Sequence, residues 1–329
     1  MPGEGAVGIL STIGRTPLVR LDRLFPGMRS QVFAKLERFN PGGSVKDRPA
    51  LEMVAAQVRS GRLVPGRSVV VESSSGNVAV GLAQVCAYHG LRFVCVTDAR
   101  VTTQNLAILR ALGAEVHVLT EPDPRTGEFL PARLRRVREL LATVPHAWSP
   151  DQYRNPLNAL AHTRTMAEIA EALDGRVDYL FCATGTCGTL RGCADHVRAA
   201  GLRTRVVAVD AVGSVIFGGA PAPRLVPGHG ASVVPPLAHP MAADEVMRVS
   251  DLDCVIGCRR LVAREAILAG GSSGACVAAF GRRWPTIPPG ATSVLIFPDG
   301  GDRYLDTIYS DEWVAEHFGE VSRLWTDAA

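Results

Sequence analysis

The sequence predicts an α/β protein with mainly parallel sheets, and two observations support this class. Short apolar and β-branched segments such as 68–72 and 92–98 have the composition of buried parallel strands. Small or polar residues and then a longer helical segment follow each of them, as at 78–89 and 103–112. Because such strand–turn–helix units alternate along the chain, parallel sheets covered by helices are expected. Ligands of such proteins bind beyond the carboxyl ends of the strands.

The same patterns place the individual elements. Strands are expected at 31–36, 68–72, 92–98, 115–119, 177–183, 204–210 and 293–297. Helices are expected at 48–59, 78–89, 103–112, 130–142, 157–173 and 259–268, with further helices opening after 184–189 and at 275. Residues 147–156 are expected to be irregular, 269–274 to form a turn, and 212–240, rich in Gly and Pro, to form a long functional loop.

Length and composition exclude several classes of protein. A chain of 329 residues is long enough for two domains or one large one. The net charge of +3 is too small to indicate a nucleic-acid or membrane-surface partner, and no apolar run is long enough for a membrane span. The first residues do not resemble a secretory signal, so a cytoplasmic protein is expected. The eight cysteines lack zinc-ligand spacing, so we expect buried thiols and no metal.

Lysine is almost absent from the chain. Only Lys35 and Lys46 occur, so 33 of the 35 basic residues are arginine. A desolvated lysine amine can form a Schiff base, whereas a guanidinium stays protonated and cannot. Two glycines and a serine precede Lys46 and a helical segment follows it, which is the pattern of a helix N-terminus facing an anion. Lys46 is therefore the candidate reactive amine, and Lys35 is expected to be an ordinary surface or edge charge.

Four loops of small residues occur in the same structural context, at 41–46, 73–77, 184–189 and 270–274. The loop at 185–189 does not match the dinucleotide pattern, and no phosphate-binding P-loop motif is present. Its backbone N–H groups and two hydroxyls instead suit a small anion such as a monophosphate. A monophosphate site together with a reactive lysine suggests pyridoxal 5'-phosphate as cofactor.

Seven short motifs occur in order along the chain, at residues 14–18, 40–48, 74–77, 152–156, 185–189, 270–274 and 298–305. Together they resemble the cysteine synthase/cystathionine β-synthase family of pyridoxal-phosphate enzymes. The resemblance implies fold type II, tryptophan synthase β-like, with two three-layer α/β domains and the active site between them. It implies a smaller mobile domain at 46–150, a larger phosphate-binding domain at 1–45 plus 151–329, and a homodimer.

By this resemblance, Lys46 is the Schiff-base lysine and later the base that takes the Cα proton. Asn77 matches the residue that hydrogen-bonds the ring hydroxyl, and Ser272 matches the serine facing the pyridine nitrogen. A serine hydroxyl leaves that nitrogen neutral, which favours loss of a β leaving group over a long-lived carbanion. The phosphate loop consists of Gly185, Thr186, Cys187, Gly188 and Thr189, and the substrate carboxylate site of Ser74, Ser75 and Gln152.

The chain departs from cysteine synthases in several places. Val78 and Ala79 replace the usual Thr-Gly, so one carboxylate contact is expected to be lost or replaced. Segments 127–134, 213–219 and 227–231 resemble instead a subgroup that makes N-(2-amino-2-carboxyethyl)-L-glutamate, towards 2,3-diaminopropionate for siderophores or peptide antibiotics. Glutamate carries two carboxylates, which suit arginine forks. Arg133 and Arg100 are therefore candidate carboxylate or phosphate ligands, and Tyr153 a candidate pocket residue; His162 and His229 receive no role.

The expected reaction is a β-replacement by a transferase acting on amino acids. O-phospho-L-serine loses phosphate to give α-aminoacrylate, and the amine of L-glutamate or a similar amino acid adds at Cβ. One alternative is a cysteine synthase that uses O-acetylserine or O-phosphoserine with sulfide. A second is a catalytically silent regulator that keeps the fold and binds a partner, although intact Lys46, Asn77 and Ser272 argue against lost catalysis.

Overall fold

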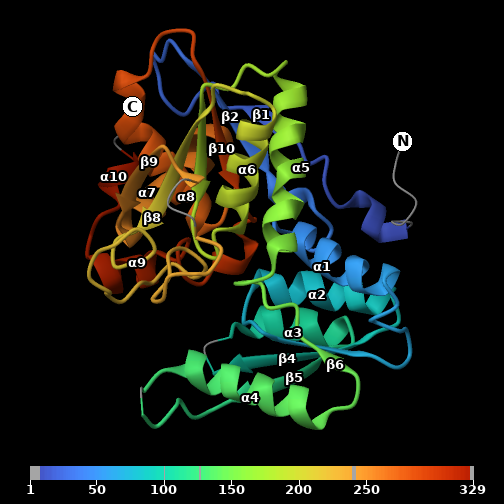
Figure 1. Ribbon diagram of the computed structural model, residues 1–329. Helices are drawn as coiled ribbons and strands as arrows, with labels where there is room; N and C mark the ends of the chain where they lie inside the picture. Colours follow the sequence, from blue (N-terminus) through green and yellow to red (C-terminus); the bar gives the residue numbers. More distant parts are fainter. Residues whose placement is uncertain (1–7, 100, 126, 239–241, 327–329) are drawn as a thin grey trace. The chain divides into compact units, whose positions relative to one another are not determined.

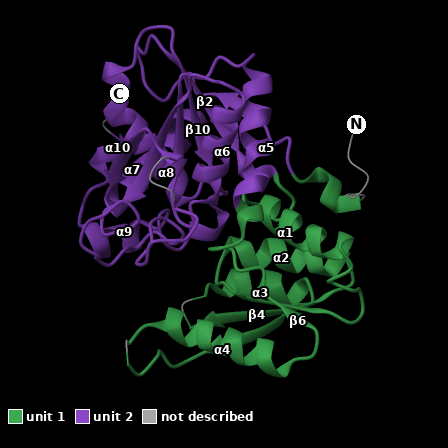
Figure 2. Ribbon diagram, viewed as in Figure 1, with its two compact units in different colours: residues 1–13, 40–158 green, residues 14–39, 159–329 purple. Residues whose placement is uncertain are grey.

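The computed structural model of the chain describes residues 8–99, 101–125, 127–238 and 242–326 (Figure 1). The described residues divide into two compact units (Figure 2). Unit 1 comprises 1–13 and 40–158, and unit 2 comprises 14–39 and 159–329. The sequence-based division had its boundaries at 45/46 and 150/151 and assigned the N-terminal residues to the larger part.

Unit 1 is built on a four-stranded parallel sheet with the order β5-β4-β3-β6. Helices α1, α2 and α3 cover one face of it and α4 covers the other, as Figure 1 shows. The strands are β3 (Val69–Ser73), β4 (Arg92–Asp98), β5 (Glu115–Leu119) and β6 (Ala147–Trp148). The helices are α1 (Asp47–Arg59), α2 (Asn77–Tyr88), α3 (Thr103–Ala111) and α4 (Phe129–Thr143), with a short 3₁₀ helix at Gly8–Thr12.

The unbroken apolar runs of β3 and β4 arise because both faces of this sheet are covered. Val70 and Phe93 pack with the cluster that contains α1, α2 and α3. Their neighbours Val69 and Val94 point to the opposite face and pack against α4. The alternation of successive side chains across a strand accounts for this division, and it makes unit 1 a three-layer structure.

Unit 2 is built on a six-stranded sheet with the order β1-β2-β10-β7-β8-β9, in which only the β1–β2 pair is antiparallel. Its strands are β1 (Leu18–Arg20), β2 (Gln31–Leu36), β7 (Tyr179–Ala183), β8 (Arg205–Ala211), β9 (Glu245–Val249) and β10 (Thr292–Phe297). The helices of this part of the chain are α5 (Pro156–Ala172), α6 (Gly188–Ala199), α7 (Asp251–Glu265), α8 (Gly271–Arg283), α9 (Asp311–Phe318) and α10 (Arg323–Thr326). Short 3₁₀ helices lie at Glu37–Phe39, Trp284–Thr286 and Asp302–Tyr304.

Each face of the unit 2 sheet has its own hydrophobic core. Leu180 and Val206 pack against α5 and α6 on one face. Phe181 and Val207, one residue further along the same strands, pack against α7 and α8 on the other. Unit 2 is therefore also three layers thick, and the expected α/β class with mainly parallel sheets is confirmed.

Three sequence-based element predictions were wrong. Residues 147–156 were expected to be irregular but begin with the two-residue strand β6, which pairs with β3. Helix α7 begins at 251 rather than 259, because Ser250 and Asp253 form a reciprocal capping box at its start. The expected turn at 269–274 ends early, since α8 begins at Gly271. Strands β1 and β9 and the last two helices were not anticipated.

A close approach of α7 to α8 fixes the start of α8. A Cβ atom on residue 257 would lie 2.2 Å from the carbonyl oxygen of Gly274, so only glycine fits. We expect Gly257→Ala to lower the free energy of unfolding by about 1–3 kcal/mol, as overpacking typically does. Gly281→Ala is the matched control in α8, where a Cβ would meet only the ring edge of Phe25 at 3.2 Å. Its effect should stay within about 1 kcal/mol, because alanine gains helix propensity.

Denaturant unfolding of both variants checks this prediction, and equal effects of the two substitutions would contradict it.

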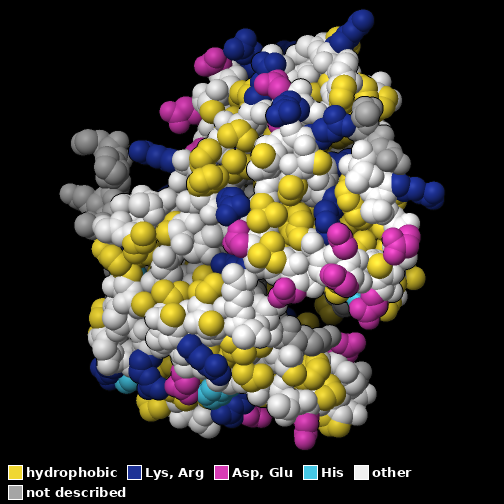
Figure 3. All heavy atoms as spheres, turned by 180° about the vertical axis from the view of Figure 1, so that it is seen from behind, with side chains coloured by type: hydrophobic (Ala, Val, Ile, Leu, Met, Phe, Trp, Pro, Cys, Tyr) yellow, Lys and Arg dark blue, Asp and Glu magenta, His cyan; other side chains and the backbone are white. Residues whose placement is uncertain are grey.

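Apolar side chains also occur on the surface. Figure 3 shows them in extended areas of one face, with arginines and carboxylates between them. Phe39 and Leu160 of unit 2 are more than half exposed. Within the described ranges, no helix combines the length and the apolar character needed to cross a membrane.

Candidate active site

Lys46 lies at the junction between a glycine loop and α1 in unit 1. It is the N-cap residue of this helix, it is half-buried, and its backbone N–H donates to Ser44 Oγ at 3.2 Å. The buried carboxylate of Asp47 accepts a hydrogen bond from the Gly42 N–H and folds the loop back on the helix. A Cβ on residue 42 would lie 2.5 Å from that carboxylate, which explains the glycine. These contacts fix the backbone from which the Lys46 side chain extends.

The loop at 73–77 leaves the carboxyl end of β3 and enters α2 at Asn77. The Ser74 N–H donates to the carbonyl of Val96 in β4, and its hydroxyl accepts from the Gly76 N–H at 3.2 Å. The Ser75 carbonyl accepts from the Asn105 side chain at 3.0 Å. Sequence reasoning missed Asn105, a buried residue of α3 that holds this loop from the far side and carries no motif.

Arg133 extends from α4 to the carboxyl end of β4. Its guanidinium is 14% exposed and lies 3.3 Å from a carboxylate oxygen of Asp98. Its Nε is buried without a hydrogen-bond partner among the described residues. Desolvation raises the pKa of Tyr153, and the positive charge of Arg133 opposes this shift, so the two side chains are near one another. Of the predicted ligands, Arg100 lies outside the described residues.

Gln152 follows β6 and is buried. Its backbone carbonyl accepts from the side chain of Asn158 at 2.7 Å. Unit 1 therefore brings Ser74, Ser75, Gln152, Tyr153 and Arg133 to the carboxyl edge of one parallel sheet, where ligands of such sheets bind.

The predicted phosphate loop lies between β7 and α6 in unit 2. Cys187, the N-cap residue of α6, has φ +65, and Gly188 opens the helix. A left-handed residue directly before a helix orients successive N–H groups towards one point, which forms an anion-binding nest. Thr186 is buried and contributes a hydroxyl beside these N–H groups. The geometry suits a small dianion at the positive end of the helix dipole.

The segment 227–231 packs directly on this phosphate loop. The Gly230 N–H donates to the Thr184 carbonyl at 2.8 Å, and a Cβ on Gly185 would lie 2.8 Å from the Gly228 carbonyl. His229 between them is buried, and burial followed by the charge of Arg224 lowers its pKa to about 4. The imidazole is therefore neutral at physiological pH.

Ser272 lies in the first turn of α8 in unit 2 and is half-buried. Ser272 therefore lies on a helix and not in the turn that the sequence suggested. The neighbouring Ser273 hydroxyl is fully buried and lacks a hydrogen-bond partner among the described residues.

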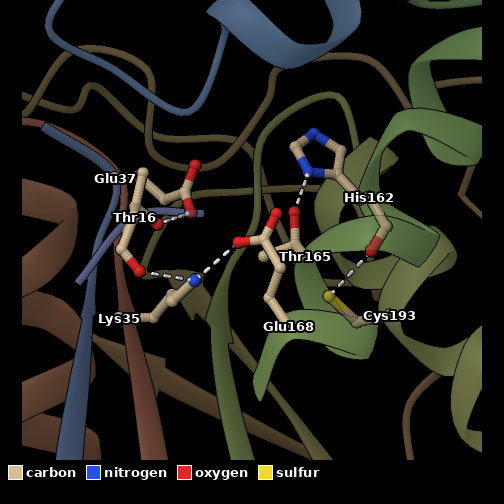
Figure 4. Close-up of polar contacts among 7 residues, drawn as sticks. All are labelled: Thr16, Lys35, Glu37, His162, Thr165, Glu168 and Cys193. Atoms are coloured by element: carbon tan, nitrogen blue, oxygen red, sulfur yellow. Dashed lines mark hydrogen bonds and ion pairs between the residues drawn. The ribbon is translucent and has the colours of Figure 1, made fainter. Parts of the chain in front are cut away.

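Lys35 is not the surface charge that the sequence suggested. It is 2% exposed, and its Nζ donates to the Thr16 carbonyl at 2.8 Å and to Glu168 Oε2 at 2.6 Å. Figure 4 shows these contacts, together with the hydrogen bond from Thr16 to Glu37. A buried amine held in this way links β2 to α5 and is not available as a nucleophile.

His162 has a structural position that sequence reasoning did not assign. The buried ring lies between the hydroxyls of Thr165, at 3.2 Å, and Thr189, at 3.3 Å (Figure 4 shows the first of these contacts). Its backbone carbonyl accepts from Cys193 Sγ. His162 thus links α5 to the last residue of the phosphate loop.

All eight cysteines are buried free thiols. Burial raises the pKa of several of these thiols, for example to about 12 for Cys276. Such thiols are inert packing residues. Within the described part of the chain, no group of three or more His, Cys, Asp or Glu side chains could hold a metal ion.

The family model of pyridoxal-phosphate dependent enzymes matches residues 9–299. The chain belongs to this family. An N-(2-amino-2-carboxyethyl)-L-glutamate synthase from Ralstonia nicotianae is 47% identical over 311 residues, which cover 94% of this chain and 91% of the relative. The expected family and cofactor are confirmed, and the chain is a pyridoxal-phosphate dependent enzyme.

Solved structures agree with the fold. An O-ureido-L-serine synthase superposes with a TM-score of 0.83 at 34% identity, covering 93% of this chain and 98% of the other. An O-acetylserine dependent cystathionine β-synthase from Helicobacter pylori superposes with a TM-score of 0.85 at 30% identity, covering 93% and 99%. These are fold type II enzymes, so this part of the fold prediction is also confirmed.

The donor sets of this enzyme fit pyridoxal phosphate. The nest at Cys187 with the α6 N-terminus suits its phosphate, and Ser272 offers a neutral hydroxyl for a ring nitrogen. Lys46 supplies the amine that the aldehyde of the cofactor requires, whereas the other lysine is held in a buried ion pair.

Proposed function

We propose that this enzyme makes N-(2-amino-2-carboxyethyl)-L-glutamate from O-phospho-L-serine and L-glutamate by β-replacement. The observation that carries the proposal is Arg133. Its guanidinium is largely buried, only one carboxylate pairs with it in the described structure, and its Nε lacks a partner there. A buried cation of this kind favours a second carboxylate, which glutamate has and sulfide does not. The 47% identical relative is named for this product.

Bound pyridoxal phosphate supplies an electron sink for the bonds at Cα of the amino acid. In the proposed site, Lys46 would hold its aldehyde carbon, and Asn77 and Ser272 would hydrogen-bond its ring hydroxyl and ring nitrogen. Residues 185–189 would hold its phosphate through N–H groups and hydroxyls. The Ser272 hydroxyl donates without bringing a negative charge, so it does not stabilise a protonated ring nitrogen.

The remaining residues act on the substrates. Ser74, Ser75 and Gln152 bind the α-carboxylate of O-phospho-L-serine, helped by the N-terminus of α2. The released Lys46 amine takes the Cα proton, and the Cβ–O bond breaks with its electron pair leaving on phosphate. The glutamate nitrogen then forms the N–Cβ bond and loses a proton, and Lys46 returns a proton to Cα. Arg133 holds a glutamate carboxylate, with Tyr153 beside it.

Several broader statements belong to this proposal. We propose that the enzyme is a homodimer in the cytoplasm, and that its product is a precursor of 2,3-diaminopropionate for a siderophore or a peptide antibiotic. Arg100 remains a proposed ligand of the phosphate or of a carboxylate.

The test is a product analysis of the purified enzyme. With O-phospho-L-serine and L-glutamate, mass spectrometry should detect N-(2-amino-2-carboxyethyl)-L-glutamate and an equal amount of phosphate. L-Aspartate, whose side chain is one methylene shorter, is the control. It should react more slowly, because its side-chain carboxylate cannot reach the same distance from the amine as that of glutamate. If sulfide outcompetes every amine and cysteine accumulates, the enzyme is a cysteine synthase and the proposal is wrong.

A further inference from the structure

Glu72 is a buried carboxylate of unit 1 for which neither the motifs nor the proposed reaction gives a role. It is the fourth residue of β3 and directly precedes the loop at 73–77. The side chain is 5% exposed, and Oε1 accepts a hydrogen bond from the Ser73 N–H at 2.9 Å. Its Oε2 is buried without a hydrogen-bond partner among the described residues. A buried carboxylate oxygen in that state is costly and calls for an explanation.

The other neighbours of this carboxylate are backbone groups of the segment after β6. The N–H groups of Gln152 and Asp151 lie close enough to lower the pKa of Glu72. The carbonyls of Asp151 and Gln152 have donors of their own. The Asp151 carbonyl accepts from the Asn155 N–H at 2.9 Å, and the Gln152 carbonyl accepts from the Asn158 side chain at 2.7 Å. The carbonyls of the segment are therefore paired within the segment and with Asn158, and its N–H groups are the ones near Glu72.

The backbone of this segment is strained as well. Asp151 has φ +47, a left-handed conformation that a non-glycine residue adopts only at a cost. Such strain persists where surrounding contacts over-determine the backbone. The carboxylate of Glu72 is a contact of this kind, because a negative acceptor attracts converging N–H groups strongly.

We propose that Glu72 is a positioning residue that holds the loop at 73–77 and the segment 151–152 in one arrangement. It thereby sets the direction of Ser74, Ser75 and Gln152 without touching the substrate. This inference rests on the proposed role of those three residues as ligands of the α-carboxylate. It adds a pH dependence, since the ionised carboxylate attracts the nearby N–H groups more strongly than the neutral acid does.

The charges around Glu72 determine where this dependence falls. Burial is the largest effect, the neighbouring charge of Asp151 adds to it, and together they raise the pKa of Glu72 to about 7. Tyr153 and Cys95 also face the carboxylate, and its charge raises the pKa of each. The positive charge of Arg133 lowers the pKa of both of these neighbours. The ionised, positioning form of Glu72 is thus the minor form below about pH 7.

The test compares the wild-type holoenzyme with Glu72→Gln, which keeps the shape but replaces one acceptor oxygen with a donor. Binding of O-phospho-L-serine is followed by the change in visible absorbance of the bound cofactor. We expect Glu72→Gln to weaken this binding by about tenfold or more at pH 8, which corresponds to the loss of one buried charged hydrogen bond. The cofactor content should not change, because Glu72 does not touch the proposed cofactor residues.

The pH profile separates positioning from a general loss of structure. The ratio of wild-type to Glu72→Gln affinity should rise between pH 6 and 8 and then level off, and the protonation of the substrate cancels in this ratio. Asp123→Asn is the matched control. It removes another buried carboxylate of unit 1, one that accepts from the Arg125 N–H at 3.0 Å, and it should leave both affinity and profile unchanged.

The pH dependence of the free energy of unfolding gives a second test, and its direction can be predicted. The pKa of Glu72 is higher in the folded protein than the 4.5 of an unperturbed glutamate, so the unfolded chain releases this proton first. The stability contributed by Glu72 should therefore fall as pH rises from about 4.5 to about 7, and Glu72→Gln should lack this component. Chemical unfolding of both proteins across this pH range measures the difference.

The outcomes distinguish this inference from the function on which it rests. If Gln152→Ala weakens binding but Glu72→Gln changes neither the affinity nor its pH profile, the positioning role is wrong and the proposed carboxylate site stands. If Gln152→Ala also leaves binding unchanged, the proposed carboxylate site is wrong, and the inference fails with it. Failure of glutamate as the second substrate would leave the role of Glu72 untouched, since the measured step precedes glutamate.

Discussion

Lys46→Ala is expected to reduce turnover by at least about a thousandfold, because it removes both the amine that holds the cofactor and the base that takes the Cα proton. Lys46→Arg should be no more active, since a guanidinium keeps the charge but cannot form a Schiff base. Steady-state rates with O-phospho-L-serine and L-glutamate measure the loss, and the visible absorbance of the cofactor reports whether it is still covalently held.

Lys35, the other lysine of the chain, is an internal control for this prediction. After borohydride reduction of the wild-type enzyme, peptide mapping should find the phosphopyridoxyl group on Lys46 alone. Lys35 should remain unmodified because its amine is buried between the Thr16 carbonyl and Glu168. A label on Lys35, or near-normal turnover by Lys46→Ala, would overturn the assignment.

Arg133→Met is expected to raise the KM for L-glutamate by about tenfold to a hundredfold, which is the usual value of a charge-assisted contact. Binding of O-phospho-L-serine in the absence of glutamate should change little. The substitution also removes the positive charge beside the buried Asp98 carboxylate, which lowers stability. Arg133→Met combined with Asp98→Asn removes both charges of this pair and should show the same selective loss.

Arg135→Ala is the matched control on the same helix. Arg135 is about half exposed and pairs with Asp123, so its loss should not affect the KM for glutamate. Steady-state kinetics with varied glutamate check all three variants. If both arginine variants behave alike, or if Arg133→Met lowers the rate with sulfide as strongly as with glutamate, then Arg133 does not select the second substrate.

Much of the fold could be predicted because its signals are local. The β-branched run 92–98 was placed at the observed bounds of β4, and the predicted helix 103–112 differs from α3 by one residue. Buried parallel strands need continuous apolar runs, and helices need a 3.6-residue repeat, so both leave a trace in the sequence. The edge strand β9 has no continuous apolar run, because its residues before the buried Val249 alternate between intermediate and exposed.

The residues of the candidate site also fall into two groups, those that the sequence predicts and those that it does not. Residues that carry chemistry stand in short motifs with glycine and serine neighbours, so Lys46, Asn77, Ser272 and the phosphate loop were found from the sequence, and their roles remain predictions. Residues that hold these loops contact them from distant parts of the chain. The Asn105 side chain donates a hydrogen bond to the carbonyl of Ser75 from 30 positions away, and no local sequence pattern predicts such a contact.

The sequence by itself determined the α/β class and the cofactor, and it predicted which amine reacts. Scarcity of lysine directed attention to Lys46, and its flanking loop gave it a chemical context. Only the tertiary structure decided that the other lysine is buried in an ion pair with Glu168, 133 positions away. It also decided that Glu72 faces the segment after β6. Burial and long-range pairing set the charge state of such groups, and both arise only when the chain has folded.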